Sequence, residues 1–592
     1  MISLSALKHD YLSGKKSPRA VITAHMNNLR ERQALSPDPA WIWLATEAQI
    51  DTQLSKLESS DPGCLPLLGI PFAVKDNIDI KDWTTTAACP AFAYTATDTA
   101  VAVQKLMQAG AILIGKTNLD QFATGLVGTR SPYGAVPNTF NPEYVSGGSS
   151  SGSASVVARG LACFSLGTDT AGSGRVPAGF NNIVGMKPTP GLVSIEGVLP
   201  ACKTLDCVSI FAGTAIDAAA VLSVMQSTCA DLTHEPQFHP ARPVVSSFPA
   251  TLRLGIPVMP QFMGNVEYEN AYNRAIASAR DMGASIVEID FSALDKIAEL
   301  LYNGPWVAER YITIEALLTT HPESIDSTVR RVVSLAEKFS AADAFKSLYE
   351  LKELAISTHC IWSECDALLV PTSPTHPTIA QVAAEPVLRN SELGTYTNFV
   401  NLLGMSAIAV PAGLTQANMP FGVTFIAPGG HDQALLALGA QWQALQTLAP
   451  GAPDTQLSKK LEHIQIAVVG AHLQDMPLHQ QLVDRNCRLV ARTHTSCAYQ
   501  LYALANTTPP KPGLVRVAAN GSAIELEVYE MPAQHVGSFL SLIPAPLGLG
   551  TIEIADGTWV KGFICEPWAI EQAQDITHLG GWRAYIASIK ES

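Results

Sequence analysis

The sequence has few charged residues, no run of basic residues and no long hydrophobic stretch. Charged side chains make up 15% of the 592 residues, against roughly 25% in an average soluble chain. The net charge is −14, and no Lys- or Arg-rich segment is present, which argues against a nucleic-acid partner. Polar residues interrupt every apolar stretch before it reaches about 18 residues, so we predict no membrane span.

Paired cysteine motifs and a secretion signal are also missing. The 11 cysteines are scattered without a C-x-x-C pair, which argues against both a zinc site and a disulfide framework. The first residues lack a basic segment followed by an apolar core. We therefore expect a cytoplasmic protein with reduced cysteines and with neither metal nor cofactor.

Helical and strand-like segments alternate along most of the chain. A helix predicted over 98–108 precedes a strand at 111–115, and a helix over 153–159 precedes a strand at 161–166. Gly110 and Gly160 lie where helix-ending glycines are expected. A third unit comprises a strand at 252–256, a helix over 267–282 and a strand at 285–289. This alternation is typical of an α/β domain with a mixed, largely buried sheet.

A polar segment rich in Pro and Gly, 446–456, interrupts this pattern and has the composition of an inter-domain linker. Strand-like segments follow, including 464–469, 523–529 and a hairpin over 550–560 with its turn at Asp556-Gly557. We predict an α/β domain over 1–450, a linker over 451–461 and a smaller α+β domain over 462–592.

Serine and glycine are concentrated in Ser146-Gly-Gly-Ser-Ser-Ser-Gly-Ser-Ala-Ser155. By composition alone, a flexible linker is as good an interpretation as a functional loop. The segment leads directly into a predicted helix and strand, which favours a loop inside a core. A second loop, Gly167-Thr-Asp-Thr-Ala-Gly-Ser-Gly-Arg175, follows that strand, where catalytic loops often lie. Neither loop has the G-x-S-x-G pattern or the phosphate-loop pattern.

A serine flanked by glycines can act as a nucleophile if a base is available. Lys75, in Gly69-Ile-Pro-Phe-Ala-Val-Lys-Asp-Asn77, follows an apolar run. The commoner explanation of such a lysine is that its stem covers apolar surface or its ammonium pairs with a carboxylate. A buried lysine can instead lose its charge and serve as a base near neutral pH.

Taken together, these segments resemble the amidase signature enzymes over about residues 20–430. The motifs are Pro71-Phe-Ala-Val-Lys-Asp, Ser146-Gly-Gly-Ser-Ser-Ser-Gly-Ser, Gly167-Thr-Asp-Thr-Ala-Gly-Ser and Gly185-Met-Lys-Pro-Thr. The resemblance implies the amidase signature fold, in which helices cover a mixed central sheet.

The resemblance also implies a Ser-Ser-Lys triad that acts through an acyl-enzyme. By motif position, Ser173 is the expected nucleophile, Ser149 the bridging serine and Lys75 the base. A cis peptide bond is expected at Gly148-Ser149. The amides expected to form the oxyanion hole are those of Thr170, Ala171, Gly172 and Ser173.

The segment 121–129 resembles the substrate loop of this family, and we expect Gly125 to let the substrate lie against the backbone. Tyr302 and Arg310 are eight residues apart, about two helical turns. Arg310 can clamp a carboxylate with two hydrogen bonds. On local evidence alone, an exposed Arg on a helix beside a core Tyr is the commoner explanation.

Within the family, the chain resembles the allophanate hydrolases, whose substrate is a small carboxylated urea. Its C-terminal region, from Val468-Val-Gly-Ala-His-Leu473, is similar to their C-terminal domain, which has a γ-glutamyl cyclotransferase-like fold. The resemblance implies a free-standing hydrolase that converts allophanate to ammonia and carbon dioxide. The expected partners are the small-molecule substrate, a second copy of the chain in a homodimer and, transiently, urea carboxylase, but no nucleic acid or membrane.

The C-terminal domain of that family has been linked to decarboxylation of the N-carboxylated product, and we choose His472 as its site residue. A packed or surface histidine is nearly as good an explanation. His494 is the reserve, and Glu525 and Glu527 share one face of a strand near the position of a cyclotransferase acid.

Three other functions remain to be weighed. A broad-specificity amidase would use the same triad. The amidase subunit of a glutamine-dependent tRNA amidotransferase would need tRNA, and the acidic charge and the different C-terminal domain count against it. An inactive binding protein would not need competent residues at all three triad positions.

Overall fold

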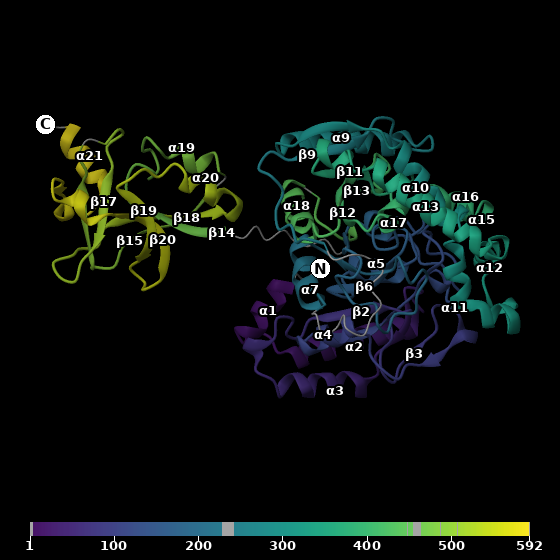
Figure 1. The fold of residues 1–592 in the computed structure, drawn as a ribbon. Helices are drawn as coiled ribbons and strands as arrows, with labels where there is room; N and C mark the ends of the chain where they lie inside the picture. Colours follow the sequence, from purple (N-terminus) through teal and green to yellow (C-terminus); the bar gives the residue numbers. More distant parts are fainter. Residues whose placement is uncertain are drawn as a thin grey trace. The chain divides into compact units, whose positions relative to one another are not determined.

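The computed structural model describes residues 4–227, 242–446, 448–453, 463–485, 487–505 and 507–590. The chain forms two compact units, Met1–Ser458 and Lys459–Ser592 (Figure 1), and each is considered by itself below. Most of the predicted linker, 451–461, lies outside the described residues. No helix in the described ranges combines the length and the apolar character needed to span a bilayer.

One large mixed sheet forms the centre of the first unit, and 11 strands of the described chain belong to it. In spatial order these strands are β1 (Trp41–Leu44), β5 (Ile112–Thr117), β2 (Pro71–Lys75), β6 (Phe164–Asp169), β8 (Cys207–Ala212), β7 (Val184–Lys187), β12 (Ser406–Leu414), β13 (Pro420–Ala427), β11 (Ala367–Pro371), β9 (Arg253–Pro257) and β10 (Ser285–Ile289). Strands β5, β2 and β6 are parallel, whereas the five pairings from β6 to β11 are antiparallel. The prediction of a mixed α/β sheet is therefore confirmed. A short separate hairpin comprises β3 (Thr84–Thr85) and β4 (Tyr94–Thr95).

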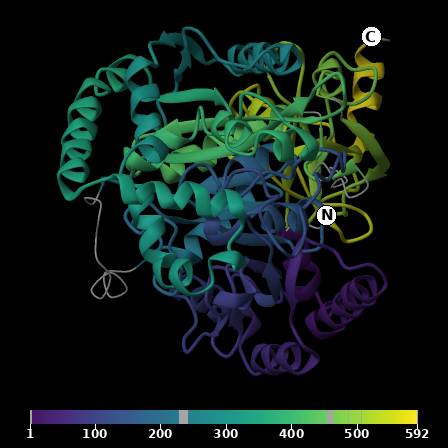
Figure 2. The same cartoon turned by 90° about the vertical axis from the view of Figure 1, so that its right-hand side faces the viewer.

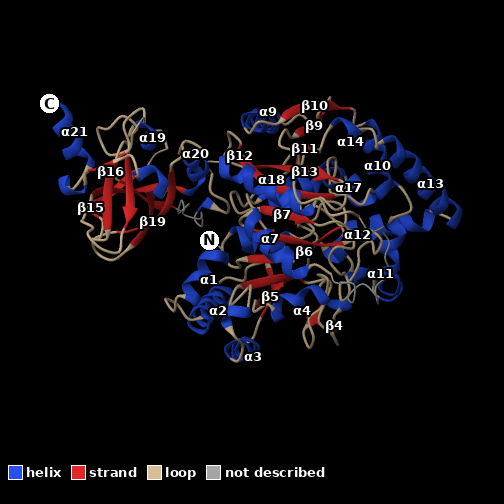
Figure 3. Ribbon diagram, turned by 60° about the vertical axis from the view of Figure 1, so that its left-hand side comes forward, coloured by secondary structure: helices blue, strands red, loops and turns tan. Residues whose placement is uncertain are grey.

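Helices cover both faces of this layer of strands (Figure 3). The N-terminal helices, purple in Figure 2, lie at one end of the unit, where α3 packs against β5 near the β1 edge. The helices are α1 (Leu4–Leu12), α2 (Pro18–Leu35), α3 (Glu47–Glu58), α4 (Val101–Gln108), α5 (Ser151–Ala158), α6 (Val176–Phe180), α7 (Ala215–Met225), α9 (Val266–Asp281), α10 (Ser292–Asn303), α11 (Val307–Thr320), α12 (Ser327–Val333), α13 (Ala341–Ser357), α14 (Ile361–Glu364), α15 (Ile379–Ala384), α16 (Leu388–Leu393), α17 (Asn398–Leu402) and α18 (Asp432–Leu445).

The three predicted helix–strand units are present, with ends shifted by up to three residues. Gly110 and Gly160 have φ values of +94° and +67°, a region that favours glycine, and each lies between its helix and the next strand. The helix predicted from residue 98 begins at Val101, and the strand predicted from residue 161 begins at Phe164. These shifts are confined to element ends, where the sequence pattern carries least information.

The parallel pairing of β2 and β6 brings two loops of the predicted site together. Val74 lies opposite Leu166, so Lys75 at the end of β2 lies beside the loop that follows β6. Helix α5 contacts both strands, and the Ser146–Ser155 segment leads into it. Carboxyl ends of adjacent parallel strands are a common location for active sites in α/β proteins.

The second unit is a smaller, sheet-rich α+β domain with its own apolar core, which contains Tyr499 and Trp582. Its five-stranded sheet runs β15 (Arg488–His494), β18 (Glu525–Pro532), β14 (His463–Val468), β20 (Trp559–Cys565) and β19 (Leu547–Glu553). A second sheet contains β17 (Pro512–Arg516), β16 (Tyr499–Ala503) and β21 (Gln574–Asp575). The helices are α19 (Gln480–Val483), α20 (Val536–Leu540) and α21 (Trp582–Lys590). The predicted hairpin is formed by β19 and β20.

Candidate active site

Lys75 is completely buried at the end of β2, every residue of which is buried. Its amine donates hydrogen bonds to Ser149 Oγ at 2.8 Å and to Thr168 Oγ1 at 2.7 Å. Within the described residues, no carboxylate lies at ion-pair distance from it. Burial is the main cause that lowers its pKa from 10.5 to about 7, although the charge of Asp206 opposes the shift. Neither common explanation of this lysine applies, because it has no exposed head group and no ion-pair partner.

Ser149 connects Lys75 to Ser173. It accepts the hydrogen bond from the lysine and donates one to Ser173 Oγ at 3.0 Å. The expected cis peptide bond at Gly148-Ser149 is present. The three side chains therefore form a continuous hydrogen-bonded chain, as the resemblance implied.

The Ser146–Ser155 segment is buried throughout, so the flexible-linker interpretation is wrong. Gly148 illustrates why: a Cβ atom there would lie 2.1 Å from Asp120 Oδ2 and 2.6 Å from the backbone nitrogen of Gly128. Such contacts are far below van der Waals distance, so only glycine fits. The glycines of this segment serve close packing around the serines rather than flexibility.

The loop after β6 carries Ser173 and is held by a buried ion pair. Asp169 and Arg175 are both fully buried and form two hydrogen bonds of 2.9 Å. Asp169 also accepts from the backbone N–H groups of Gly172 and Gly174, each at 2.9 Å. Burial opposes ionisation of Asp169, but the adjacent Arg175 holds its pKa below the usual value. This ion pair fixes the loop that carries the predicted nucleophile.

One expected oxyanion donor is already engaged. The N–H of Gly172 bonds to Asp169 Oδ1, so it is not free to meet an oxyanion, which differs from the expectation. Within the described residues, the N–H groups of Thr170, Ala171 and Ser173 have no hydrogen-bond acceptor. Gly172 instead provides the backbone shape: its φ is +126°, and a Cβ atom there would lie 2.4 Å from Thr397 Oγ1.

Arg310 is buried, with 3% of its surface exposed, so the exposed-arginine explanation is wrong. Its guanidinium donates to the backbone oxygen of Ala123 at 3.2 Å, to Thr124 Oγ1 at 3.3 Å and to the Tyr302 hydroxyl at 3.5 Å. The charge of Arg310 also lowers the pKa of Lys75, so the two groups interact electrostatically. Among the described residues, no carboxylate forms an ion pair with Arg310. Asp206 and Glu309 act on Arg310 electrostatically, but in the described part of the chain neither carboxylate lies at ion-pair distance from the buried guanidinium.

Tyr302 and Arg310 do not lie on one continuous helix. Tyr302 belongs to α10, which ends at Asn303, and Arg310 belongs to α11, which begins at Val307. The Gly304-Pro305 pair separates the helices, consistent with the helix-breaking character of proline. The side chains still meet, with the guanidinium carbon 5.4 Å from the centre of the Tyr302 ring.

Gly125 lies in the loop that contacts Arg310. A Cβ atom at this position would lie 2.6 Å from Asp120 Oδ2. Asp120 is fully buried and accepts hydrogen bonds from the N–H groups of Val127, Gly128 and Arg130 at 2.9 to 3.2 Å. It therefore organises the segment that we predicted to be the substrate loop.

Sequence reasoning missed Asp120, Asp169 and Asp206. Asp206 is buried; it accepts from Thr170 Oγ1 and from the N–H of Ala201 at 2.8 Å, and burial raises its pKa to about 6. The signal available in the sequence was an aspartate among apolar and small residues. Such an aspartate is expected to be buried and therefore to be paired with other groups. No group of three potential ligands in the described residues is arranged to hold a metal ion.

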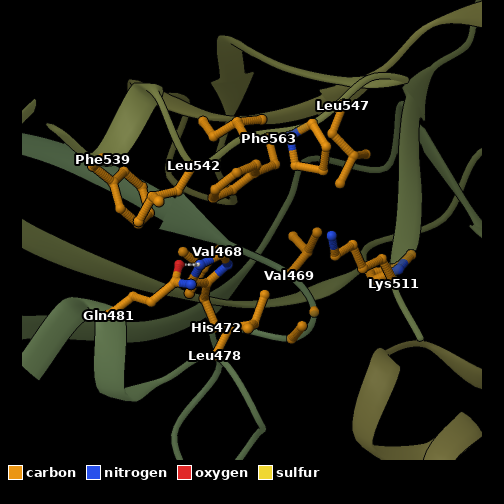
Figure 4. A pocket seen from close by; sticks show the side chains of 15 residues that line it. Val468, Val469, His472, Leu478, Gln481, Lys511, Phe539, Leu542, Leu547 and Phe563 are labelled. Carbon is orange, nitrogen blue, oxygen red and sulfur yellow. Dashed lines mark hydrogen bonds between the residues drawn. The ribbon is translucent and has the colours of Figure 1, made fainter. Parts of the chain in front are cut away.

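In the second unit, His472 lines a mainly apolar cavity (Figure 4). Its ring is stacked on Phe563 at 5.1 Å between centroids and meets Phe539 edge-on at 5.3 Å. Its Nε2 lies 2.9 Å from Gln481 Oε1. Burial lowers the pKa of this imidazole, which favours the neutral ring.

The reserve residues lie elsewhere in the second unit. His494 is exposed and lines a separate cleft with Glu525. Glu527 is fully buried and forms ion pairs with Arg583 at 2.9 Å and Arg492 at 3.2 Å. It also accepts hydrogen bonds from the Tyr529 hydroxyl and a backbone N–H. With these partners, its carboxylate is occupied by structural interactions.

Comparison with known proteins identifies two matching families. The amidase family model matches residues 41–436, and the model of the allophanate hydrolase C-terminal domain matches residues 464–587. The urea amidolyases of Lachancea kluyveri and Saccharomyces cerevisiae are both 44% identical to this chain, over 602 and 624 residues. The matches cover 98% and 100% of this chain but 33% and 34% of those proteins. The chain thus spans about one third of the length of these relatives.

Among solved structures, Kluyveromyces lactis allophanate hydrolase is similar over both units. The TM-score is 0.72 at 44% identity, and the match covers 98% of this chain and 99% of that chain. The crystal structure of K. lactis urea amidolyase matches with a TM-score of 0.71, over 98% of this chain and 36% of that chain.

Proposed function

This chain is an amidohydrolase of the amidase family with the domain architecture of an allophanate hydrolase, and from this premise we propose that it hydrolyses allophanate, urea carrying an N-carboxylate. The observation that carries the proposal is the buried guanidinium of Arg310 beside the Lys75–Ser149–Ser173 chain, which no carboxylate of the described residues approaches to ion-pair distance. A buried cation without an anionic partner is costly, and a substrate carboxylate offsets this cost. A small amide that carries a carboxylate therefore fits the site.

In the proposed mechanism, neutral Lys75 takes a proton from Ser149, which takes one from Ser173 as Ser173 Oγ attacks the terminal amide carbon. The N–H groups of Thr170, Ala171 and Ser173 are the free donors available to the oxyanion. The proton then returns to the leaving nitrogen and ammonia departs. Water hydrolyses the acyl-enzyme by the same route and releases N-carboxycarbamate.

Substrate binding falls to Arg310, Tyr302 and Gly125 in this proposal. Arg310 would bind the carboxylate, with the Tyr302 hydroxyl 3.5 Å from the guanidinium. The absence of a side chain at Gly125 keeps the neighbouring loop close to Asp120, and the proposal places the substrate against the backbone of this loop.

The proposed second reaction is decarboxylation of N-carboxycarbamate in the C-terminal unit, with His472 as its site residue. The half-buried, neutral imidazole at the wall of an apolar cavity supports this role, because neutral histidine can accept and return a proton. The overall products are then ammonia and carbon dioxide.

We place this reaction in urea degradation, in the cytoplasm. The relatives named urea amidolyases, about three times as long, support a urea-derived substrate and a transient association with urea carboxylase. The ten cysteines in the described ranges are all free thiols, as expected in a reducing compartment.

A homodimer is the proposed assembly, and α13 supports it. None of the 17 residues of this helix is buried within the described chain. Phe345, Tyr349 and Ile356 are 58%, 61% and 67% exposed, and they make α13 suitable for an interface. Sedimentation of Tyr349→Glu should reveal monomers, whereas an unchanged dimer would show that α13 is not the interface.

The test of the main proposal compares allophanate, biuret, malonamate and glutamine by ammonia release. Allophanate should be the best substrate, and Arg310→Ala should raise its KM by roughly 10- to 150-fold, as expected for a charge-assisted hydrogen bond. Turnover of biuret, which lacks the carboxylate, should change much less. The exposed Arg331→Ala serves as the matched control. Equal losses for allophanate and biuret in Arg310→Ala would contradict the assignment of the carboxylate to Arg310.

A further inference from the structure

The cavity beside His472 has apolar walls and three polar side chains of different chemistry. Phe539, Phe563 and other hydrophobic side chains form the walls of a small cavity of about 30 Å³. The polar groups are the imidazole of His472, the amide of Gln481 and the ammonium of Lys511. Figure 4 shows Gln481 next to His472 and Lys511 on the opposite side of the cavity. The arrangement is that of a small-molecule site with few, separated polar contacts.

Positive charge dominates the electrostatics of this cavity. Burial is the main cause that lowers the pKa of His472, and the positive charges of Lys511 and Arg485 lower it further. Arg485 is already engaged, since it bonds to Ser538 and to the backbone oxygen of Gln481. In the described part of the chain, the Lys511 ammonium has no hydrogen-bond or ion-pair partner. A cation at an apolar wall without a partner attracts an anion.

Gln481 determines which nitrogen of His472 carries the proton. The amide oxygen Oε1 lies 2.9 Å from Nε2, so Nε2 donates its hydrogen to it. The other ring nitrogen, Nδ1, then has a free lone pair, and no described residue bonds to it. The two phenyl rings hold the plane of the imidazole. His472 is thus prepared to accept a proton at Nδ1.

We propose that Lys511 binds the carboxylate that remains on the substrate of this cavity and that Gln481 is a positioning residue that directs Nδ1 of His472 toward the reacting group. The inference rests on the proposed decarboxylation of N-carboxycarbamate in this unit. Lys511 is then the cation that selects a carboxylate substrate, and the His472 tautomer with its proton on Nε2 is the form that the reaction requires. The ligand class is a small carboxylate with a second carboxyl group two bonds away.

The decarboxylation step neither gains nor loses a proton overall. The substrate enters as the monoanion HOOC–NH–COO⁻, with its carboxylate on Lys511. Nδ1 of His472 takes the proton of the carboxyl group, the C–N bond breaks, and its electron pair stays on nitrogen. The imidazolium returns the same proton to that nitrogen. The products are CO₂ and H₂N–COO⁻, and His472 is again neutral.

Binding is tested on the full chain with malonate, in which CH₂ replaces the NH of the substrate. In ¹³C,¹⁵N-histidine-labelled protein, the His472 signals, assigned with His472→Asn, report on this cavity alone. Malonate should shift them, and Lys511→Met should weaken this binding about tenfold or more. Lys561→Met, a change on the exposed face of β20, should not alter it. Equal malonate affinity in Lys511→Met and wild type would overturn the role of Lys511.

Steady-state kinetics of decarboxylation distinguish the binding role of Lys511 from the positioning role of Gln481. They also test these two roles separately from the decarboxylase function itself. With supplied N-carboxycarbamate, and after subtraction of the uncatalysed rate, Lys511→Met should raise KM. Gln481→Leu should lower kcat and change the ¹⁵N shifts that report the tautomer, and Gln481→Glu, which keeps an acceptor for Nε2–H, should restore them in part. Wild-type kinetics and tautomer in Gln481→Leu would refute the positioning role. If His472→Asn also leaves CO₂ release unchanged, the decarboxylase function itself fails; if only Lys511→Met and Gln481→Leu are silent, the inference alone fails.

Discussion

The pH dependence of amide hydrolysis follows from the burial of Lys75. The base must be neutral to accept a proton, and burial lowers its pKa from 10.5 to about 7. At pH 7 about half of the molecules then have a neutral Lys75, against roughly 0.03% for an unshifted lysine, a difference of about 1,500-fold. We therefore expect kcat/KM to rise about tenfold from pH 6 to a plateau above pH 8.

The assay is initial ammonia release at subsaturating substrate from pH 5.5 to 9.5. Asp206 has a pKa of about 6 and also changes charge in this range, so Asp206→Asn is the necessary control. The inflection should persist in that variant but move below pH 7, because it belongs to Lys75 and the charge of Asp206 raises the pKa of that lysine. A profile that is flat across this range, or one that is still rising steeply at pH 9.5, would refute the assignment of neutral Lys75 as the base.

Three further predictions concern stability. Asp169→Asn should lower the free energy of unfolding by about 3–5 kcal/mol in urea titrations, since Arg175 would remain buried without its partner; a loss below 1 kcal/mol would contradict this. Gly148→Ala should yield little soluble protein because its Cβ would lie 2.1 Å from a buried carboxylate oxygen, whereas Gly537→Ala, with nothing within 4 Å, should express normally. From about pH 7 to 10, unfolded Lys75 holds a proton that the folded form has lost, so the free energy of unfolding should rise with pH; Lys75→Met should reduce this rise, and an identical slope would count against it.

The sequence predicted elements that depend on local pattern. Alternating helices and strands, such as α9 and β10, were recognisable from apolar spacing and from the glycines between them. The predicted boundary between two domains likewise rested on a local pattern, the proline- and glycine-rich stretch 446–456. Residues that act through contacts distant in the sequence were not predictable in this way. The local sequence around Arg310 predicts an exposed residue on a helix. The fold instead buries Arg310 against Ala123 and Thr124, which are distant in the sequence.

The candidate triad was located by motif resemblance, but its surroundings were not. Asp169 occurs inside a quoted motif, yet its bond to the N–H of Gly172 depends on the shape of the loop. Motif position alone therefore predicted Gly172 as an oxyanion donor, although its N–H is already bonded to Asp169. His472 shows the same limit: its sequence context indicates a strand end, whereas its contact with Gln481 depends on where helix α19 lies in the fold.

The central claim is that Ser173, activated through Ser149 by Lys75, hydrolyses allophanate. The most direct measurement is ammonia release from allophanate by the purified chain and by Ser173→Ala at equal concentration. Circular dichroism should show that the variant keeps the wild-type fold. The account predicts rapid release by the wild type and, in the variant, a loss of about a thousandfold or more. Comparable rates in the two proteins, or no release by the wild type, would contradict it.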